Sequence, residues 1–159
     1  MSITSTKNGS KYVIAGIGSH LLVYDWKRNN LILREKIETL TPIYALIFHP
    51  NEDELWAGST GYALRFRFQK RNWYAPDTLT NKQENVHSLA FTSSGSNLIC
   101  NQGATTAYTS YPTPTLPYSP KPILQHSGRV LWQIYQQKKN KLAIATANGV
   151  LKIYQIKAD

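Results

Sequence analysis

Four copies of one short pattern recur along this chain of 159 residues. Each copy is a short apolar run, then a turn containing Gly or Asn, then a second apolar run. The copies open at Val13, Leu55, Leu98 and Leu142, so their starts lie 42, 43 and 44 residues apart. Self-similarity at a nearly fixed period indicates one structural unit repeated along the chain. The fold must therefore be built from four equivalent modules.

Each module is predicted to be a small antiparallel β-sheet. A further run of strand-forming residues ends seven residues before each opening, at Thr6, Phe48, Phe91 and Tyr135. The runs are rich in Val, Ile, Tyr, Trp and Thr, and polar hairpins separate them. A period of about 40–45 residues with four short strands is typical of a β-propeller blade. We predict an all-β fold of four propeller-type blades, over about residues 1–41, 42–84, 85–128 and 129–159.

The outer strand of a blade is expected near residues 31–37, 73–75 and 123–125, and the last blade lacks one. Residues 31–40 also fit a short amphipathic helix, but their place as the fourth strand of the first repeat favours a strand. Residues 113–122 contain four prolines and are expected to form an extended surface loop.

The predicted core consists of apolar residues from the first and second strands of the repeats. Its members are Ile43, Ala45, Ile47, Leu55, Ala57, Leu89, Phe91, Leu98, Leu131, Leu142 and Ile144.

Several of these segments resemble the WD40 repeat family, and the resemblance covers essentially the whole chain. Residues 43–51 (Ile-Tyr-Ala-Leu-Ile-Phe-His-Pro-Asn) resemble the first strand of that family and its following turn, and residues 86–92 resemble the same strand. Residues 125–130 place His126 just before a first strand, as the family does, and Asn148-Gly149 replaces the Asp-Gly turn. The name-giving Trp-Asp pair is absent, and Tyr24-Asp25 and Tyr154-Gln155 stand in its place.

The resemblance also implies a buried hydrogen-bond chain within the blades. In the family a histidine, a serine or threonine, an aspartate and a tryptophan form it. Repeat four retains only part of the set, with His126 and Thr146, Asn148 in place of the acid and Tyr154 in place of the indole. Blade cohesion is therefore expected to depend mainly on apolar packing.

The number of repeats predicts an incomplete ring. The family usually closes with six to eight blades, so we expect a homodimer or a hetero-complex to complete the propeller, with a compact ring of four blades as the alternative. The last strand is expected to be an open edge that invites strand addition. Its residues are Val150, Leu151, Lys152, Ile153, Tyr154 and Ile156.

The chain is basic, with 18 Lys and Arg against 9 Asp and Glu, and its formal net charge is +9. Such a balance favours acidic proteins or nucleic acid as partners. The strongest local cluster of cations and aromatics is predicted to bind a partner, and it comprises Arg65, Arg67, Lys70, Arg71, Trp73 and Tyr74. The competing interpretation is that these arginines cover a neighbouring blade with their stems.

No pattern of catalytic or metal-binding residues is visible. The four histidines come from different repeats without ligand spacing, so we expect no metal, no cofactor and no enzyme activity. Cys100 is the only cysteine, which excludes an intrachain disulfide, and its apolar strand predicts a buried, inert thiol. No apolar run is long enough to cross a membrane as a helix. We expect an intracellular protein of the cytoplasm, with the nucleus as the alternative.

These features predict a non-catalytic protein-interaction or scaffold module that joins a larger multi-subunit assembly. The alternative function is a basic, nucleic-acid-associated subunit of a ribonucleoprotein or DNA-binding complex. Salt dependence separates the two, because nucleic-acid binding weakens steeply as salt rises.

Overall fold

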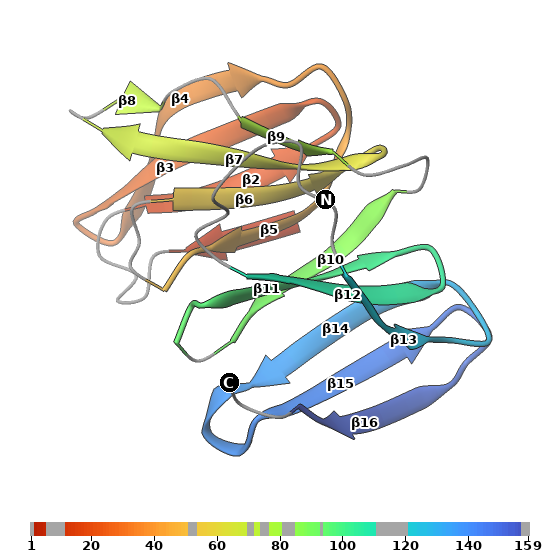
Figure 1. The fold of residues 1–159 in the computed structure, drawn as a ribbon. Coiled ribbons are helices and arrows are strands. Elements are labelled where there is room, and N and C mark those ends of the chain that lie inside the picture. The colour runs from red at the N-terminus through yellow and green to blue at the C-terminus, as the bar shows by residue number, and fades with distance from the viewer. Residues whose placement is uncertain are drawn as a thin grey trace.

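The computed structural model describes residues 2–5, 12–50, 54–69, 72–73, 77–80, 85–92, 94–110 and 121–156. Over these ranges the chain forms sixteen β-strands and one short 3-10 turn, η1 (Gln137–Lys139), with no α-helix. The strands group into four antiparallel sheets (Figure 1). The all-β prediction is therefore confirmed.

The first two sheets follow the repeat in chain order. Sheet one contains β1 (Ser2–Ser5), β2 (Tyr12–Ile17), β3 (His20–Lys27) and β4 (Asn30–Glu38). Sheet two contains β5 (Ile43–Phe48), β6 (Glu54–Ser59) and β7 (Tyr62–Gln69), followed by β8 (Asn72–Trp73) and β9 (Asp77–Thr80). Both β8 and β9 pair with β7, so the outer strand of this sheet is in two pieces. Residues 30–38 form a strand, and the helical alternative is wrong.

The last two sheets repeat the plan. Sheet three contains β10 (Val86–Phe91), β11 (Asn97–Gln102), β12 (Thr105–Ser110) and β13 (Lys121–Gln125). Sheet four contains β14 (Val130–Gln136), β15 (Lys141–Thr146) and β16 (Leu151–Gln155), and it has no fourth strand among the described residues. Of the predicted proline-rich loop, residues 113–120 lie outside the described ranges, and Lys121 and Pro122 begin β13.

The turn between the second and third strands contains a glycine with positive φ in all four sheets. Gly18, Gly61, Gly103 and Gly149 occupy it, with φ between +52° and +80°. Glycine adopts this left-handed conformation without the steric penalty of a Cβ atom. The repeated turn therefore sets the register of each hairpin from local sequence alone.

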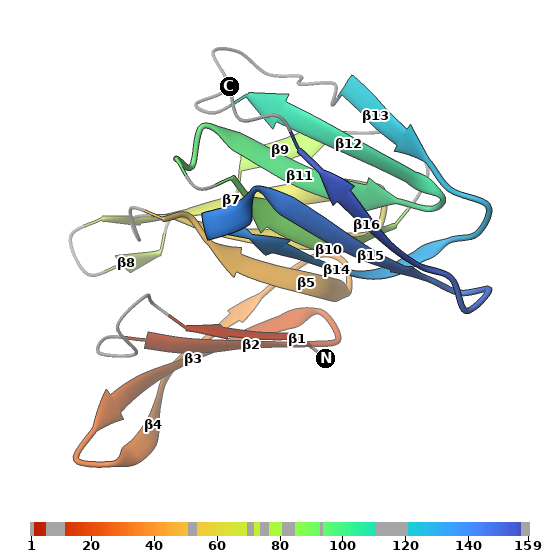
Figure 2. The ribbon, with the colours of Figure 1, turned by 90° about the horizontal axis from the view of Figure 1, so that it is seen from below.

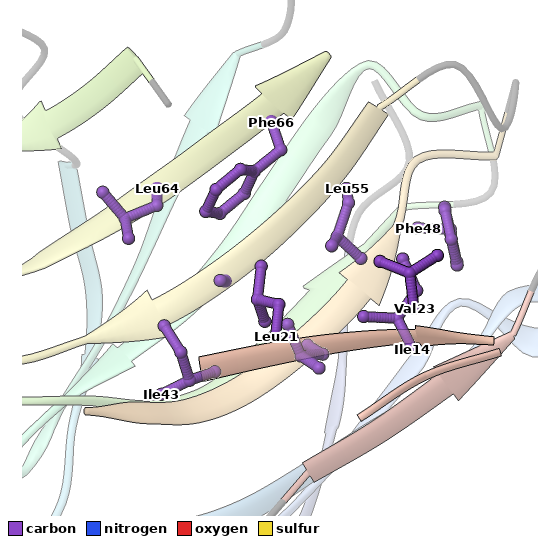
Figure 3. Close-up of a cluster of buried hydrophobic side chains, with 10 residues drawn as sticks. Ile14, Leu21, Val23, Ile43, Phe48, Leu55, Leu64 and Phe66 are labelled. Atoms are coloured by element: carbon purple, nitrogen blue, oxygen red, sulfur yellow. The ribbon is translucent and has the colours of Figure 1, made fainter. Parts of the chain in front are cut away.

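The four sheets follow one another as blades, which we number 1 to 4 in chain order (Figures 1 and 2). Their inner strands are neighbours, β1 with β5, β5 with β10 and β10 with β14. Each blade has an N-side face, directed toward the preceding blade, and a C-side face, directed toward the following blade. Figure 3 shows how Ile14, Leu21 and Val23 of blade 1 meet Ile43 and Phe48 of blade 2.

Both faces of the inner blades are buried. Residues 55–59 of β6 are all buried, with Leu55 and Ala57 in the cluster between blades 1 and 2 and Trp56 in the cluster between blades 2 and 3. A third cluster joins Ala90 and Ile99 of blade 3 to blade 4. Trp56 is a core residue that the sequence prediction did not include, and it is buried because a blade between two others is covered on both faces.

Most of the predicted core is buried. Ile47 is half-buried, and the prediction that Leu131 lies in the core is wrong because its side chain is 49% exposed. The register of β14 on β15 shifts between Val130 and Trp132, which leaves Leu131 without a partner in the ladder. Such a β-bulge redirects the extra side chain. The residues that are buried as predicted are Ile43, Ala45, Leu55, Ala57, Leu89, Phe91, Leu98, Leu142 and Ile144.

Two leucines of one hairpin should therefore respond differently to truncation. Leu142→Ala is expected to lower the free energy of unfolding by about 2–5 kcal/mol, since Leu142 is fully buried. Leu131→Ala is the matched control and is expected to cost less than about 1 kcal/mol. Denaturant unfolding measures both values, and equal losses would contradict the bulge at Leu131.

Candidate functional site

A groove of about 760 Å³ runs along the inner strands of the blades. Residues of β1, β5, β10 and β14 line it, so all four repeats contribute. Three of these strands carry a β-bulge at the same position, which leaves Tyr44, His87 and Leu131 outside the regular ladder. All three side chains line the groove. The bulges thus give each of these repeats one residue that faces the groove instead of a neighbouring blade.

The groove is aromatic and has little charge. The rings of Tyr44 and His87 lie 4.9 Å apart between centroids, and Trp132, which is 54% exposed, lines the same groove. Burial, and to a lesser extent the charge of Arg129, lowers the pKa of His87 from its ordinary value of 6.5. Neutral imidazole, phenol and indole groups suit recognition of another protein surface.

A buried hydrogen-bond chain connects blades 3 and 4. Thr106 Oγ1 donates to Asn101 Oδ1 at 2.5 Å, because that oxygen can only accept. His126 Nε2, 2.8 Å from Thr106 Oγ1, must then donate to it. Its Nδ1 is left as an acceptor for the hydroxyl of Tyr154 at 3.5 Å. The histidine in this arrangement is neutral.

The chain continues inward to the groove. Asn101 Nδ2 donates to Gln133 Oε1 at 2.6 Å, and Gln133 Nε2 donates to the carbonyl of Ile99 at 3.1 Å. Every bond therefore points the same way, from Tyr154 on the outermost strand to Gln133 on the innermost. Aligned hydrogen bonds polarise one another, and a complete buried network specifies one packing arrangement.

This chain differs from the one implied by the family resemblance. His126 bonds to Thr106 of blade 3 and not to Thr146 of blade 4, which the resemblance implied as its partner. Thr146 Oγ1 instead donates to Asn148 Oδ1 at 2.5 Å, and Asn148 Nδ2 donates to Ser127 Oγ at 3.1 Å. The predicted set is thus divided into two groups. His126 and Tyr154 belong to the chain that includes Thr106, and Thr146 and Asn148 are bonded to each other.

The predicted partner-binding cluster is only partly on the surface. Arg65 is 7% exposed and lies over the ring of Trp56, with its guanidinium carbon 5.8 Å from the centroid. Arg67 is exposed, and its Nε lies 3.7 Å from Glu54 Oε1. Arg65 is therefore buried beside Trp56, which belongs to the cluster between blades 2 and 3. Of the other members, Trp73 is described only as backbone in β8, and Lys70, Arg71 and Tyr74 lie outside the described residues.

The last strand is an edge of its sheet. β16 pairs with β15 on one side and with no other strand in the described part of the chain. Leu151 and Ile153 project from the C-side face and are 67% and 66% exposed. Tyr154 and Ile156 pack on the opposite side, in the cluster shared with blade 3. The remaining predicted edge residues differ, since Val150 precedes the strand and is half-buried and Lys152 is exposed.

Two sheet faces expose large apolar side chains, one at each end of the blade series. On the C-side face of blade 4, Trp132 and Ile134 of β14 lie beside Ala143 and Ala145 of β15, followed by the exposed Leu151 and Ile153 of β16. The N-side face of blade 1 is similar, and its exposed members are Ile3, Ile17, Trp26, Leu31 and Leu33. No other described sheet covers either face. Apolar patches that span a whole sheet face commonly mark interaction sites.

The described residues show no grouping typical of metal binding or thiol chemistry. No three of their His, Cys, Asp or Glu side chains come together as a metal site would require. Burial raises the pKa of Cys100 to about 12, so its thiol stays protonated at neutral pH. Within the described residues, no helix is long and apolar enough to cross a membrane.

Comparison with known proteins identifies the fold and no closer relationship. No protein-family model matches the sequence, and no curated protein matches it. Among solved structures, the β-propeller domain of Cps50 (Swd1) from Myceliophteria thermophila superposes with a TM-score of 0.78 at 14% sequence identity. The match covers 98% of this chain and 52% of that domain, so this chain spans about half its length. The fold is that of a β-propeller.

The neutral state of His126 predicts how stability depends on pH. Burial, and secondarily the charge of Lys152, lowers the pKa of His126 from its ordinary value of 6.5. The unfolded chain therefore binds more protons than the folded chain when the pH falls below about 6.5. Stability should be complete above that pH and should fall as the pH drops toward the folded-state pKa.

Unfolding measured between pH 8 and pH 5 tests this expectation. His126→Gln should be less stable at pH 8 and should lose less stability on acidification than the unmodified chain. His87→Gln removes the other histidine with a lowered pKa, and the double variant should show the weakest pH dependence. An unchanged pH profile in His126→Gln would show that the imidazole is not held neutral by the fold.

Proposed function

We propose that this chain is a WD40-like, non-catalytic protein-interaction module that forms part of a larger multi-subunit assembly. The observation that supports it is the pair of uncovered apolar faces, on blade 1 and blade 4. Inside the protein the equivalent faces are buried against another blade, so the end faces should also be covered by protein when the module works. The open edge of β16 offers a further contact, since its backbone can accept an added strand.

The central groove supports the same role. Its bulge residues Tyr44, His87 and Leu131 are aromatic or aliphatic, and the adjacent, tilted rings of Tyr44 and His87 offer a contact surface for a peptide or a loop. Aromatic residues are enriched at protein interfaces. The single buried cysteine fits a reducing compartment, and we place the protein in the cytoplasm, with the nucleus as the alternative.

The mass of the native particle tests the proposal. In an extract of the source cells the tagged chain should migrate well above its own 18.0 kDa. Ile153→Glu or Leu33→Glu should reduce that mass, because each places a charge on an end face that a partner must cover. Leu40→Glu is the matched control, since Leu40 is fully exposed between β4 and β5 and belongs to neither face. A native particle containing only one copy of this chain and nothing else would contradict an assembly role.

The positive charge supports an acidic partner, with nucleic acid as the alternative. Arg67, Lys70, Arg71, Trp73 and Tyr74 remain the proposed contact, without the buried Arg65. Arg67→Glu with Arg71→Glu should weaken binding of the copurifying partner by at least tenfold. The double variant Lys138→Glu with Lys139→Glu is the control, because it makes the same charge change at η1.

A salt series then separates the two kinds of partner. If the partner is nucleic acid, log affinity falls linearly with log salt, with a slope close to the number of phosphates contacted. An acidic protein that also buries apolar surface gives a shallower slope. Binding that both charge variants leave unchanged would remove this segment from the interface.

A further inference from the structure

We propose that two copies of this chain close a single ring of eight blades. In that ring the C-side face of blade 4 in each copy packs on the N-side face of blade 1 in the other. The inference builds on the proposed function, because it identifies what covers the two end faces. It is argued from the register of the four repeats.

The C-side face of blade 4 exposes a position that is buried in blades 1 and 2. Ile153 pairs with Ala143 in the same way that Val23 pairs with Ile14 in blade 1. Arg65 holds the equivalent position in blade 2, where it pairs with Trp56. Val23 and Ile14 are 0% exposed and Arg65 is 7% exposed, whereas Ile153 is 66% exposed. The C-side face of blade 4 is therefore half of a blade-to-blade contact.

The N-side face of blade 1 is the other half. Ile3 pairs with Ala15 as Leu46 pairs with Ala57 in blade 2 and as Leu89 pairs with Cys100 in blade 3. Leu46 and Leu89 are each 8% exposed, and Ile3 is 64% exposed. A C-side face and an N-side face are the two partners of every internal contact. The chain therefore exposes one face of each kind, and the exposed C-side face of one copy can pack on the exposed N-side face of another.

The internal contact between blades 1 and 2 predicts which residues meet across the ring. A Cβ atom on Gly16, on the C-side face of blade 1, would lie 3.3 Å from Leu46 Cδ1 and closer still to Ile43. In the strand register, Ala145 of blade 4 is equivalent to Gly16 of blade 1. Ile3 of blade 1 is equivalent to Leu46 of blade 2. Ala145 of one copy should therefore lie against Ile3 of the other. A small residue at this position lets the two sheets approach closely.

The size of the ring favours a second copy as the occupant. The chain matches 52% of the length of one solved propeller domain, so two copies supply about the length of a complete ring. Rings of four to eight blades are the usual range, and two-fold closure is the commonest symmetry of homo-oligomers. Four covered faces at roughly 500 Å² each would bury on the order of 2,000 Å², which is what a stable dimer needs.

Charge gives the contact a distinctive salt dependence. Each copy carries a formal charge of +9, while the proposed contact residues Ile3, Leu33, Trp132 and Ile153 are apolar. The two copies repel one another at long range, and salt screens that repulsion. Dimerisation should therefore strengthen between 50 mM and 500 mM salt, in contrast to binding of nucleic acid or an acidic protein.

Sedimentation equilibrium of the purified chain at micromolar concentration is the first test. The unmodified chain should be a dimer, and Ile153→Glu and Leu33→Glu should each raise the dissociation constant at least a hundredfold, because each variant spoils both contacts of the ring. Leu40→Glu should remain a dimer. Circular dichroism and thermal melting confirm that each variant is folded, and Leu33→Arg replaces Leu33→Glu if the latter is not.

The pattern across variants separates the ring from other associations. A dimer formed by pairing of two β16 edges would be weakened by Ile153→Glu and left intact by Leu33→Glu, which overturns the proposal. A ladder of larger oligomers would indicate open head-to-tail chains and also overturns it. A monomeric purified chain overturns the ring while leaving the assembly role standing, provided that the native particle is larger than one chain.

Cysteine cross-linking tests the predicted neighbours directly. The double variant Ile3→Cys with Ala145→Cys should form a covalent dimer when treated with a short bis-maleimide, and each single variant should stay monomeric on a denaturing gel. Buried Cys100 should not react. Leu40→Cys with Ala145→Cys is the control and should also stay monomeric. Cross-linking in the control or its absence in the test variant would contradict the proposed contact.

Discussion

Face-to-face packing of two-sided sheets is the interaction on which the rest of this structure depends. Every blade is apolar on both faces, and each face leaves water only when another blade covers it. β6 illustrates the requirement, since its residues 55–59 are buried on both sides and serve two different clusters. A series of such blades always ends in uncovered faces unless it closes. The exposed apolar side chains on blades 1 and 4 follow from this constraint.

Packing of this kind does not by itself fix how one blade sits on the next. Apolar faces can slide, whereas a buried polar network has one satisfied arrangement. The hydrogen-bond chain from Tyr154 to Gln133 performs that task between blades 3 and 4 and crosses the interface at Asn101 and Thr106. It stands where the family resemblance implied a network within one blade. The chain lacks the Trp-Asp pair of the family it resembles, and a polar link joins blades 3 and 4.

The bulges of the inner strands place side chains on the groove. A regular strand would direct all of its side chains to the two neighbouring blades and leave the groove lined mainly by backbone. One extra residue in β5, β10 and β14 releases Tyr44, His87 and Leu131 from that alternation. The irregularity costs a ladder position and supplies each of these repeats with a side chain on the groove.

The sequence by itself determined the repeat, the all-β fold and the turns, because these depend on residues close together in the chain. Gly18, Gly61, Gly103 and Gly149 mark the turn between the second and third strands of each repeat, and the last sheet shows three strands among the described residues, as predicted. The edge of β16 was also predicted from its position in that pattern.

Only the tertiary structure decided which face each side chain occupies. Leu131 leaves the core because a bulge shifts its register, and Arg65 is buried beside Trp56 although the sequence placed it in a surface cluster. His126 bonds to Thr106 of the third sheet and not to Thr146 of the fourth, which the family resemblance implied as its partner. The physical reason is common to all three. A strand's periodicity is local, but burial and hydrogen-bond partners depend on the neighbouring blade, whose position no short stretch of sequence specifies.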